Sequence, residues 1–391
     1  MSLPCQRQQF DLPGGITYLN CAYMGPLSHR VLAAGVNGLS RKSQPWEISS
    51  EDFFTDLELA RDLFARLVGG DAEGVALLPS VSYGIATAAR NLPVPSNSEI
   101  VVLAEQFPSN VYVWQDLARR TEATLRTVAR PADGDWTREI LTVLSPKTSI
   151  AALPHCHWTD GTLLDLERIG ARLRQVGASL VVDGCQSVGA LPIDVELVRP
   201  DFLVTASYKW LLGPYSHGFM WVAPEWRSGE SLEMNWIARS NSHDFASVVN
   251  YTDQYAPGAR RFDVGEVSNF GLLPSAIAAL HQCREWGVDE IQKTLAELTN
   301  AIASHALELG LEVAPSENRS GHLIGLRLAG RDPRALAAAL ADAQVFVSVR
   351  GDSVRVAPHV YNDTDDVLRF VDVLARSLTS GSHSSPATTA Q

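Results

Sequence analysis

Short runs of apolar residues recur along the first two thirds of the chain and alternate with segments of helical periodicity. The runs are apolar on both faces, which is typical of strands buried between two layers of helices. Between two of these runs, residues 163–178 place apolar side chains at helical spacing, and Gly177 suits the end of that helix. The alternation predicts a mostly parallel sheet in a layered α/β fold. The apolar runs span residues 99–105, 149–155, 179–184, 202–207 and 218–223.

The pattern changes after about Ala256. Two helical stretches rich in Ala and Leu, 275–286 and 289–309, precede two apolar runs, and a last helix is expected from about Thr364. This arrangement predicts a second, smaller α+β domain. The final residues are rich in Ser and Thr without periodicity and are expected to be disordered. The expected organisation is an N-terminal segment 1–17, a large domain 18–257, a small domain 258–378 with apolar runs at 323–328 and 345–349, and a tail 379–391.

Composition narrows the class of protein. The chain has 391 residues, of which 46 % are apolar and 19 % are charged, as expected for an ordinary globular protein. A formal net charge of −12 argues against a nucleic-acid or anionic-membrane partner. The five cysteines form no CxxC pair, so neither a disulfide framework nor a metal site is indicated. No apolar run approaches the roughly 18 residues of a membrane span, and no signal core is evident, so a cytoplasmic protein is expected.

Two charged residues follow two of the predicted buried strands. Asp183 ends one strand, and Lys209 comes 26 residues later, just after another. Adjacent parallel strands would bring both groups to the carboxyl edge of the sheet, where open α/β sheets bind ligands. Taken singly, they could be a loop cap and a surface lysine. Together they suit pyridoxal 5′-phosphate (PLP), whose aldehyde forms a Schiff base with a lysine and whose ring nitrogen is kept protonated by a carboxylate.

Four segments extend this interpretation: YLNCAYMGPL, VVDGCQS, SYKWLLGP followed by HGFMWV, and VRVAPHVYN. On these segments, the chain from about Tyr18 to Leu378 resembles the class V aminotransferase family of fold-type I PLP enzymes. That family includes cysteine desulfurases, isopenicillin N epimerase, kynureninase and hercynylcysteine sulfoxide lyases. The resemblance implies an α/β fold of type I, with a large domain whose mostly parallel, seven-stranded-type sheet lies between helices and a smaller α+β C-terminal domain.

The resemblance also implies roles around the cofactor. Lys209 would form the Schiff base and then move the α-proton, while Asp183 would pair with the pyridinium. Gln186 would reach the ring oxygen or the imine region. Phe107 falls where desulfurases place a histidine over the cofactor ring, and its aromatic face could stack there, although a buried core phenylalanine is the alternative.

The phosphate of the cofactor has its own matching segment. Ser80, Val81 and Ser82 correspond to a helix N-terminus where hydroxyl and backbone N–H groups hold the anion. Desulfurases carry a further phosphate-binding serine three residues before the lysine, where this chain has alanine. Ser207 or Tyr208 is expected to substitute for it, with Thr205 as another candidate.

The remaining matches concern the substrate. Arg355 corresponds to the arginine that grips the substrate α-carboxylate, a role that suits the bidentate guanidinium. Arg350 lies close by in the sequence and could be confused with it. Asn20 would meet the same carboxylate from the N-terminal side. His157 and Trp158 follow a predicted strand and are candidates to line the site. No metal is implied, because PLP itself supplies the electron sink.

One segment points to a second subunit. Residues 258–270 correspond to a stretch that reaches the phosphate of the neighbouring subunit in this family, which implies a homodimer with shared sites. Many relatives have threonine where this chain has Glu266, and a carboxylate would repel the phosphate. Ser268 or Asn269 is therefore expected to make that contact.

The cysteines separate the members of the family. Desulfurases need a cysteine on a loop of the small domain, and this chain has none after Cys283. The leading hypothesis is therefore a lyase for a C–S or related bond of an amino acid, working without a sulfur-carrying cysteine. An aminotransferase or an epimerase of the same family is the alternative. A non-catalytic PLP-binding protein is a more remote one.

Overall fold

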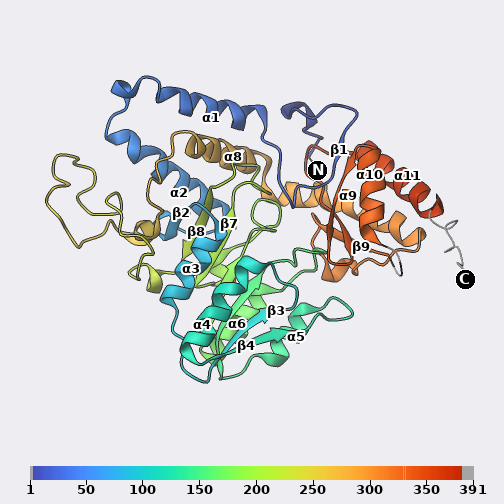
Figure 1. Ribbon diagram of the computed structural model, residues 1–391, viewed down its shortest axis with the longest axis horizontal. Coiled ribbons are helices and arrows are strands. Elements are labelled where there is room, and N and C mark those ends of the chain that lie inside the picture. The colour runs from blue at the N-terminus through green and yellow to red at the C-terminus, as the bar shows by residue number, and fades with distance from the viewer. Residues whose placement is uncertain (1–2, 329, 331, 381–391) are drawn as a thin grey trace, which may run out of the picture.

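A seven-stranded sheet forms the centre of the larger of two lobes (Figure 1). The computed structural model describes residues 3–328, 330 and 332–380. In space the strands run in the order β2-β8-β7-β6-β5-β3-β4, and β8 is antiparallel to both of its neighbours while the other pairs are parallel. The predicted mostly parallel, seven-stranded sheet is confirmed. Its strands are β2 (Val75–Leu78), β3 (Glu99–Leu103), β4 (Thr124–Val128), β5 (Thr148–Pro154), β6 (Ser179–Asp183), β7 (Phe202–Ala206) and β8 (Gly218–Val222).

Helices cover both faces of this sheet. Strand β6 shows why, because its adjacent residues Val181 and Val182 belong to separate apolar clusters, one on each face. A strand that is apolar on both faces needs a helical layer on each. The helices of the larger lobe are α1 (His29–Arg41), α2 (Thr55–Leu67), α3 (Val81–Asn91), α4 (Tyr112–Thr121), α5 (Trp136–Val143), α6 (Leu166–Val176), the short α7 (Val195–Val198) and α8 (Leu272–Trp286).

The second lobe contains a three-stranded antiparallel sheet and three helices. The strand order is β11-β12-β9, and the short strand β1 of the N-terminal segment pairs with β10 beside it. This agrees with the small α+β domain expected from the sequence. Its elements are α9 (Val288–Glu308), β9 (Ile324–Arg327), α10 (Pro333–Asp342), β10 (Val345–Phe346), β11 (Ser348–Arg350), β12 (Ser353–Val356) and α11 (Thr364–Ser380), with β1 at Thr17–Tyr18.

Two helices bear on the expected domain bounds: α8 near the boundary between the lobes, and α11 at the end of the described chain. Helix α8 packs against α1 and α2, on the side of the large sheet, and the domain boundary at 257/258 stays a prediction. Helix α11 includes Thr379 and Ser380, so the tail cannot start before residue 381. The rest of the predicted disordered tail, 381–391, lies outside the described residues. Among the helices of the described chain, none combines the length and the apolar character that crossing a membrane requires.

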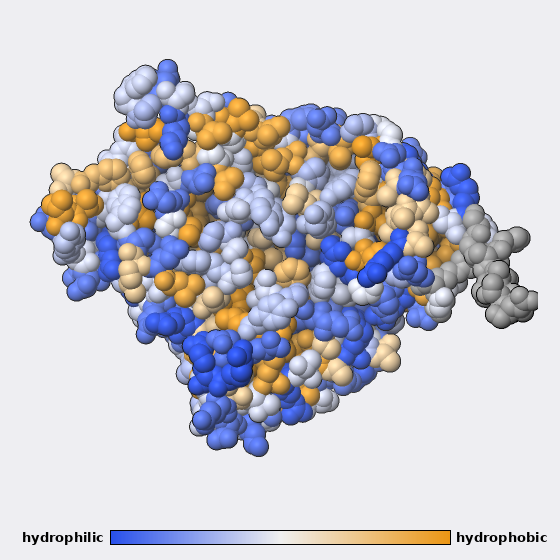
Figure 2. Space-filling model, in the orientation of Figure 1, coloured by the Kyte–Doolittle hydropathy of each residue, from blue (hydrophilic) through white to orange (hydrophobic). Residues whose placement is uncertain are grey.

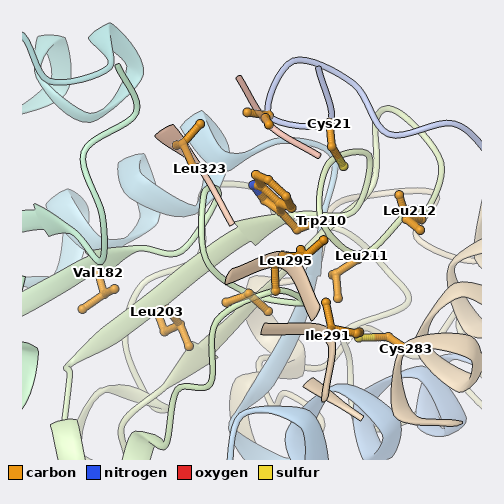
Figure 3. Packing of buried hydrophobic residues seen from close by; sticks show 14 of the residues in the cluster. Cys21, Val182, Leu203, Trp210, Leu211, Leu212, Cys283, Ile291, Leu295 and Leu323 are labelled. Carbon is orange, nitrogen blue, oxygen red and sulfur yellow. The ribbon is translucent and has the colours of Figure 1, made fainter. Parts of the chain in front are cut away.

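Two interactions fix the segments that carry the site. In Figure 3, Trp210, Leu211 and Leu212, which directly follow the candidate lysine, lie in the apolar cluster that also contains Ile291 and Leu295 of α9. The turn after β7 is thereby anchored in the core. The second interaction is a buried ion pair between Arg61 of α2 and Asp263, which lies in the segment before α8.

Candidate active site

Asp183 and Lys209 lie together at the carboxyl edge of the large sheet. Asp183 is the last residue of β6, and Lys209 stands three residues beyond the end of the parallel neighbour β7. Each residue is 7 % exposed, and both line one cavity of about 300 Å³. The sequence-based expectation that neighbouring strands would bring these two groups to one edge agrees with this placement.

The carboxylate of Asp183 is buried without a cation beside it. Its Oδ1 accepts a hydrogen bond from the backbone N–H of Cys185 at 3.0 Å, and no ion pair to it is found within the described chain. Burial raises the pKa of Asp183, while the N–H of Cys185 and the charge of Lys209 act in the opposite direction. A cationic N–H group entering the cavity would relieve this cost.

The lysine side chain stands between aromatic rings. Its Nζ lies 5.6 Å from the ring centroid of Phe107 and 5.5 Å from that of Tyr208, and it has no carboxylate partner among residues 3–328, 330 and 332–380.

Gly25 packs against the backbone of Tyr208 and Lys209, since the N–H of Gly25 donates to Tyr208 O at 2.8 Å. A Cβ at Gly25 would come within 2.4 Å of Lys209 O, so only glycine permits this approach.

The N-terminus of α3 faces the same cavity. Ser80 caps the helix, because its Oγ accepts a hydrogen bond from Tyr83 N at 3.2 Å, and it lies 3.0 Å from Ser82 Oγ. Ser80, Val81 and Ser82 all line the cavity that contains Lys209. Exposed hydroxyl groups at the positive end of a helix suit an anion such as a phosphate.

Of the two residues before the lysine, the structure brings one to the cavity. Tyr208 lines it together with Tyr215, and their ring centroids are 4.7 Å apart. Ser207 is 1 % exposed and does not line it, because its Oγ turns to His217 Nδ1 at 3.1 Å. The Ser207 hydroxyl is thus used inside the protein and His217 lines the cavity, while the expected cofactor contact of Ser207 stays a prediction.

A second cavity of about 240 Å³ continues from Lys209 toward the small sheet, and Arg355 of β12 lines it. The guanidinium is 1 % exposed. Its Nε donates to Ser348 Oγ at 3.1 Å and its Nη1 to Trp158 O at 3.0 Å, whereas Nη2 has no partner within the described residues. Burial, with repulsion from Arg350 added, lowers the pKa of Arg355 to about 9. A carboxylate would both satisfy Nη2 and compensate the charge.

The loop after β5 presents Trp158, and not His157, to this cavity. His157 is 0 % exposed. Its Nε2 lies 3.1 Å from Ala104 O and its Nδ1 2.8 Å from Thr159 Oγ1. Both ring nitrogens of His157 are thus used inside the protein, and the structure does not bring this side chain to the cavity. Its expected substrate contact stays a prediction. Trp158 lines the cavity and packs edge-on against Phe107, with ring centroids 5.4 Å apart.

Two residues of this loop, Trp158 and Asp160, connect it to both lobes. Asp160 is buried and forms ion pairs with Arg130 of the large lobe and, at 3.4 Å, with Arg327 of β9. Two positions away, the carbonyl oxygen of Trp158 accepts the hydrogen bond from Arg355 of β12. The N–H of Gly325 on β9 also donates to Asp160 O at 3.2 Å. The loop is therefore attached to the small sheet at two of its residues, Trp158 and Asp160.

Of the two other predicted contacts, Gln186 lines a cavity and Asn20 lines neither of the two. Gln186 lines the second one, and its amide is held by Ala22 O at 3.1 Å and by Trp210 Nε1 at 2.9 Å. Asn20 forms a backbone bridge with Ala357 just beyond β12, and its Oδ1 is buried without a partner within the described residues.

The segment expected to serve a second subunit uses its polar groups within its own chain. Ser268 Oγ donates to Phe53 O at 2.6 Å. Asn269 Oδ1 accepts hydrogen bonds from the backbone at the start of α8. Whether either side chain contacts a neighbouring phosphate stays a prediction.

Sequence reasoning missed several residues that line the cavities. Each lies within a few residues of a recognised segment, but nothing in the local pattern distinguishes a side chain that faces the cavity from one that faces the core. For His217, the signal was its place directly before the buried strand β8, antiparallel to β7. The missed residues include Tyr23, Met24, Ser109, Tyr215, Ser216 and His217.

Comparisons with known proteins agree with this geometry. The uncharacterized aminotransferase YcbU of Bacillus subtilis is 30 % identical over 322 residues, covering 81 % of this chain and 83 % of that protein. Isopenicillin N epimerase of Streptomyces clavuligerus is 25 % identical over 333 residues, with 81 % and 83 % covered. The fold matches that of the cystine C–S lyase C-DES in complex with its product cysteine persulfide, with a TM-score of 0.85 and 20 % identity over 93 % of this chain and 98 % of that one.

A second C-DES structure, of a lysine-to-alanine variant with glycine covalently linked to PLP, gives a TM-score of 0.86 at 20 % identity, over 95 % of this chain and 99 % of that one. These likenesses establish the fold. The model of the class-V aminotransferase family matches residues 40–374, which is most of the chain. The protein is therefore an enzyme of the class-V aminotransferase family.

Proposed function

We propose that this enzyme binds PLP at Lys209 and cleaves a C–S or related bond of an amino acid. One observation carries the proposal. A buried carboxylate without a cation, a lysine without an anion and the hydroxyl-bearing N-terminus of a helix all line a single cavity. The carboxylate suits a ring N–H, the lysine suits an aldehyde, and the helix N-terminus suits a phosphate, and PLP carries all three groups.

The donor set fits PLP group by group. Ser80 and Ser82 at the start of α3 would hold the phosphate, Asp183 would pair with the ring nitrogen, and Phe107 would pack on the ring. When bound, PLP withdraws electrons from the substrate Cα, which makes cleavage of a bond there possible. The C-DES structure with glycine linked to PLP supports this assignment, since the two folds agree.

The chain's own residues divide the remaining work. Arg355 would bind the substrate α-carboxylate through its free Nη2 and thereby orient the Cα bonds. Lys209 Nζ is the amine at the junction of the two cavities, and it would accept the proton from Cα and pass a proton to the departing sulfur. Trp158 and Phe107 pack edge-on and form an aromatic wall along this junction.

The thiols support a lyase that needs no sulfur-carrying cysteine. Cys185 lies in the cavity beside Asp183, and burial raises its pKa, so the thiol stays protonated at neutral pH. Burial likewise raises the pKa of Cys156, to about 12. A protonated thiol is a poor nucleophile, so neither is suited to take up sulfur. The similarity to a cystine C–S lyase favours C–S cleavage.

Two related activities remain candidates because of named relatives. YcbU is named as an aminotransferase and the Streptomyces protein as an epimerase. A panel of amino acids distinguishes the three reactions. A lyase releases pyruvate or a sulfur product, and an aminotransferase needs a keto acid as amino-group acceptor. An epimerase inverts Cα with exchange of its proton and forms neither a keto acid nor a sulfur product. Detection of the second or third pattern alone would replace the lyase assignment.

The cofactor is tested first. We expect the purified protein to be yellow and Lys209→Ala to lose the absorbance band of the lysine-linked cofactor. The exposed Lys147 offers a matched control, and Lys147→Ala should keep the band. A colourless wild-type protein that PLP does not restore would refute the proposal.

We also propose a homodimer. Helix α1 exposes Leu32, Val36 and Leu39 at helical spacing, each more than half exposed, and Trp46 follows at 76 %. Figure 2 shows hydrophobic residues gathered along the edge where Figure 1 places α1 and α8. Analytical ultracentrifugation should find a dimer at assay concentrations, and a fully active monomer would exclude it.

A further inference from the structure

Three arginines lie on one face of the small sheet. In the register of this sheet, Arg350 of β11 stands opposite Ser353, and Arg355 stands opposite Ser348. Arg327 of β9 stands opposite Ser353 on the other side. Residues directly opposite one another, and residues two apart on a strand, share a face. The three guanidinium groups are therefore neighbours on the side that faces the loop after β5.

Their partners differ. Arg327 forms ion pairs with Asp160 and with Asp352, both at 3.4 Å. Arg350 and Arg355 have no carboxylate partner in the described part of the chain. Arg350 donates to the carbonyl of its neighbour Val349 at 2.7 Å and is half-buried. Two of the three arginines thus keep their charge uncompensated.

Both uncompensated arginines line the cavity that begins at Lys209. Their Cζ atoms lie 5.5 Å (Arg350) and 6.0 Å (Arg355) from the ring centroid of Trp158. The residues that line this cavity include no aspartate or glutamate. Burying two like charges beside each other is costly unless anions compensate them, so the site is built for more than one negative group.

A single α-carboxylate does not account for both. Arg355 is buried at 1 % exposure, and one of its nitrogens, Nη2, has no hydrogen-bond partner within the described residues. Arg350 is the more exposed of the two and lies on the other strand of the hairpin. A carboxylate held by Arg355 leaves Arg350 available for a second group farther along the substrate.

We infer that the substrate is an amino acid whose side chain carries a second acidic group, with the α-carboxylate on Arg355 and the side-chain acid on Arg350. This inference rests on the proposed function and names its substrate class. Trp158 contributes the flat apolar surface between the two anchors, over which the methylene groups of such a side chain would lie. Neutral amino acids of the same length would leave Arg350 without an anion and bind more weakly.

The test uses ligands without an amine, so that no turnover occurs. The holoenzyme is titrated by calorimetry with succinate against butyrate and with glutarate against pentanoate, pairs that differ by one carboxylate. One charge-assisted hydrogen bond corresponds to about tenfold to a hundredfold in affinity. We expect at least one dicarboxylate to bind about tenfold or more tightly than its partner.

The variants assign the effect to residues. Arg350→Gln should abolish the preference while the monocarboxylate still binds, whereas Arg355→Gln should weaken both ligands. Arg350→Lys keeps the charge and should keep part of the preference. The control is Arg334→Gln, which removes the same charge from an exposed position on α10 and should change nothing.

Two results would overturn the inference: a wild-type enzyme without a preference for the dicarboxylate, or a preference that survives Arg350→Gln. If the preference survived while Arg350→Gln dissociated the dimer, Arg350 would be an interface residue. The cofactor absorbance of the same samples is recorded separately. Its absence in the wild type refutes the proposed function, whereas its presence without a dicarboxylate preference refutes this inference alone.

Discussion

Replacing Arg355 tests the geometry of the site most directly. The side chain is anchored by Ser348 Oγ and Trp158 O, which leaves Nη2 free within the described residues. Arg355→Ala removes the group that would bind the α-carboxylate but leaves the Lys209 cavity intact. We therefore expect cofactor absorbance to be retained and substrate capture to be lost.

The magnitude follows from the bonds involved. One charge-assisted hydrogen bond contributes roughly 1.5–3 kcal/mol, which corresponds to about a tenfold to a hundredfold loss of kcat/KM. Two bonds would give more, so this range is a lower limit. Arg355→Lys should recover part of the loss, because an ammonium group lacks the planar fork and cannot bond to Ser348, Trp158 and a carboxylate in the same way.

The assay is steady-state kinetics with the best substrate from the panel, alongside thermal unfolding of each variant. Arg350→Ala serves as the comparison and should cost less for a substrate with one carboxylate. If Arg355→Ala retained more than half of the wild-type kcat/KM while remaining folded, the assignment of the carboxylate site would be wrong. If Arg350→Ala cost more, the two arginines would have to exchange roles.

Four further outcomes follow. Asp183→Asn should keep some cofactor and lose turnover, and an unchanged kcat would contradict this. The same variant should raise the melting temperature of the cofactor-free protein at neutral pH, because burial raises the pKa of Asp183 and its ionised form destabilises the fold. Cys185→Ser should retain most activity, and its inactivation with PLP still bound would restore a thiol mechanism. Arg61→Ala should cost about 3–5 kcal/mol in urea unfolding, since it leaves Asp263 buried and unpaired. Carboxylate affinity should fall as pH rises through about 9, where the free Arg355 guanidinium loses its charge, and a flat titration from pH 8 to 10 would argue against this.

The sequence predicted the strands that are apolar on both faces but not those at the edges of the sheet. Strand β4 has three exposed residues, one half-buried and only one buried, Val128, so it lacks the signature of a central strand. Strand β2 has four residues, too few for a periodic pattern. The reversed direction of β8 was equally hidden, because direction depends on pairing and not on composition.

The site was predictable where a residue's position along a strand determines its place. Asp183 and Lys209 follow adjacent parallel strands, so both had to reach one edge. The predicted residues that the structure does not bring to the cavities lie in loops. His157 and Trp158 differ by one position, and which of them faces the cavity is decided by bonds to Ala104 and Thr159 that are invisible in the local sequence. The orientation of Ser207 likewise depends on its distant partner His217.

The loop after β5 is attached to the small sheet at two of its residues, and this has a mechanical consequence. Trp158 bonds to Arg355 and Asp160 to Arg327, so two neighbouring strands of the small sheet grip one loop of the large lobe at points two residues apart. Two attachments resist twisting, whereas one would act as a pivot. If the lobes move during the catalytic cycle, the aromatic wall and the carboxylate anchor must travel as one rigid body, and the hinge must lie elsewhere. Mutation of Asp160 would then alter the stiffness of this body before it altered its chemistry.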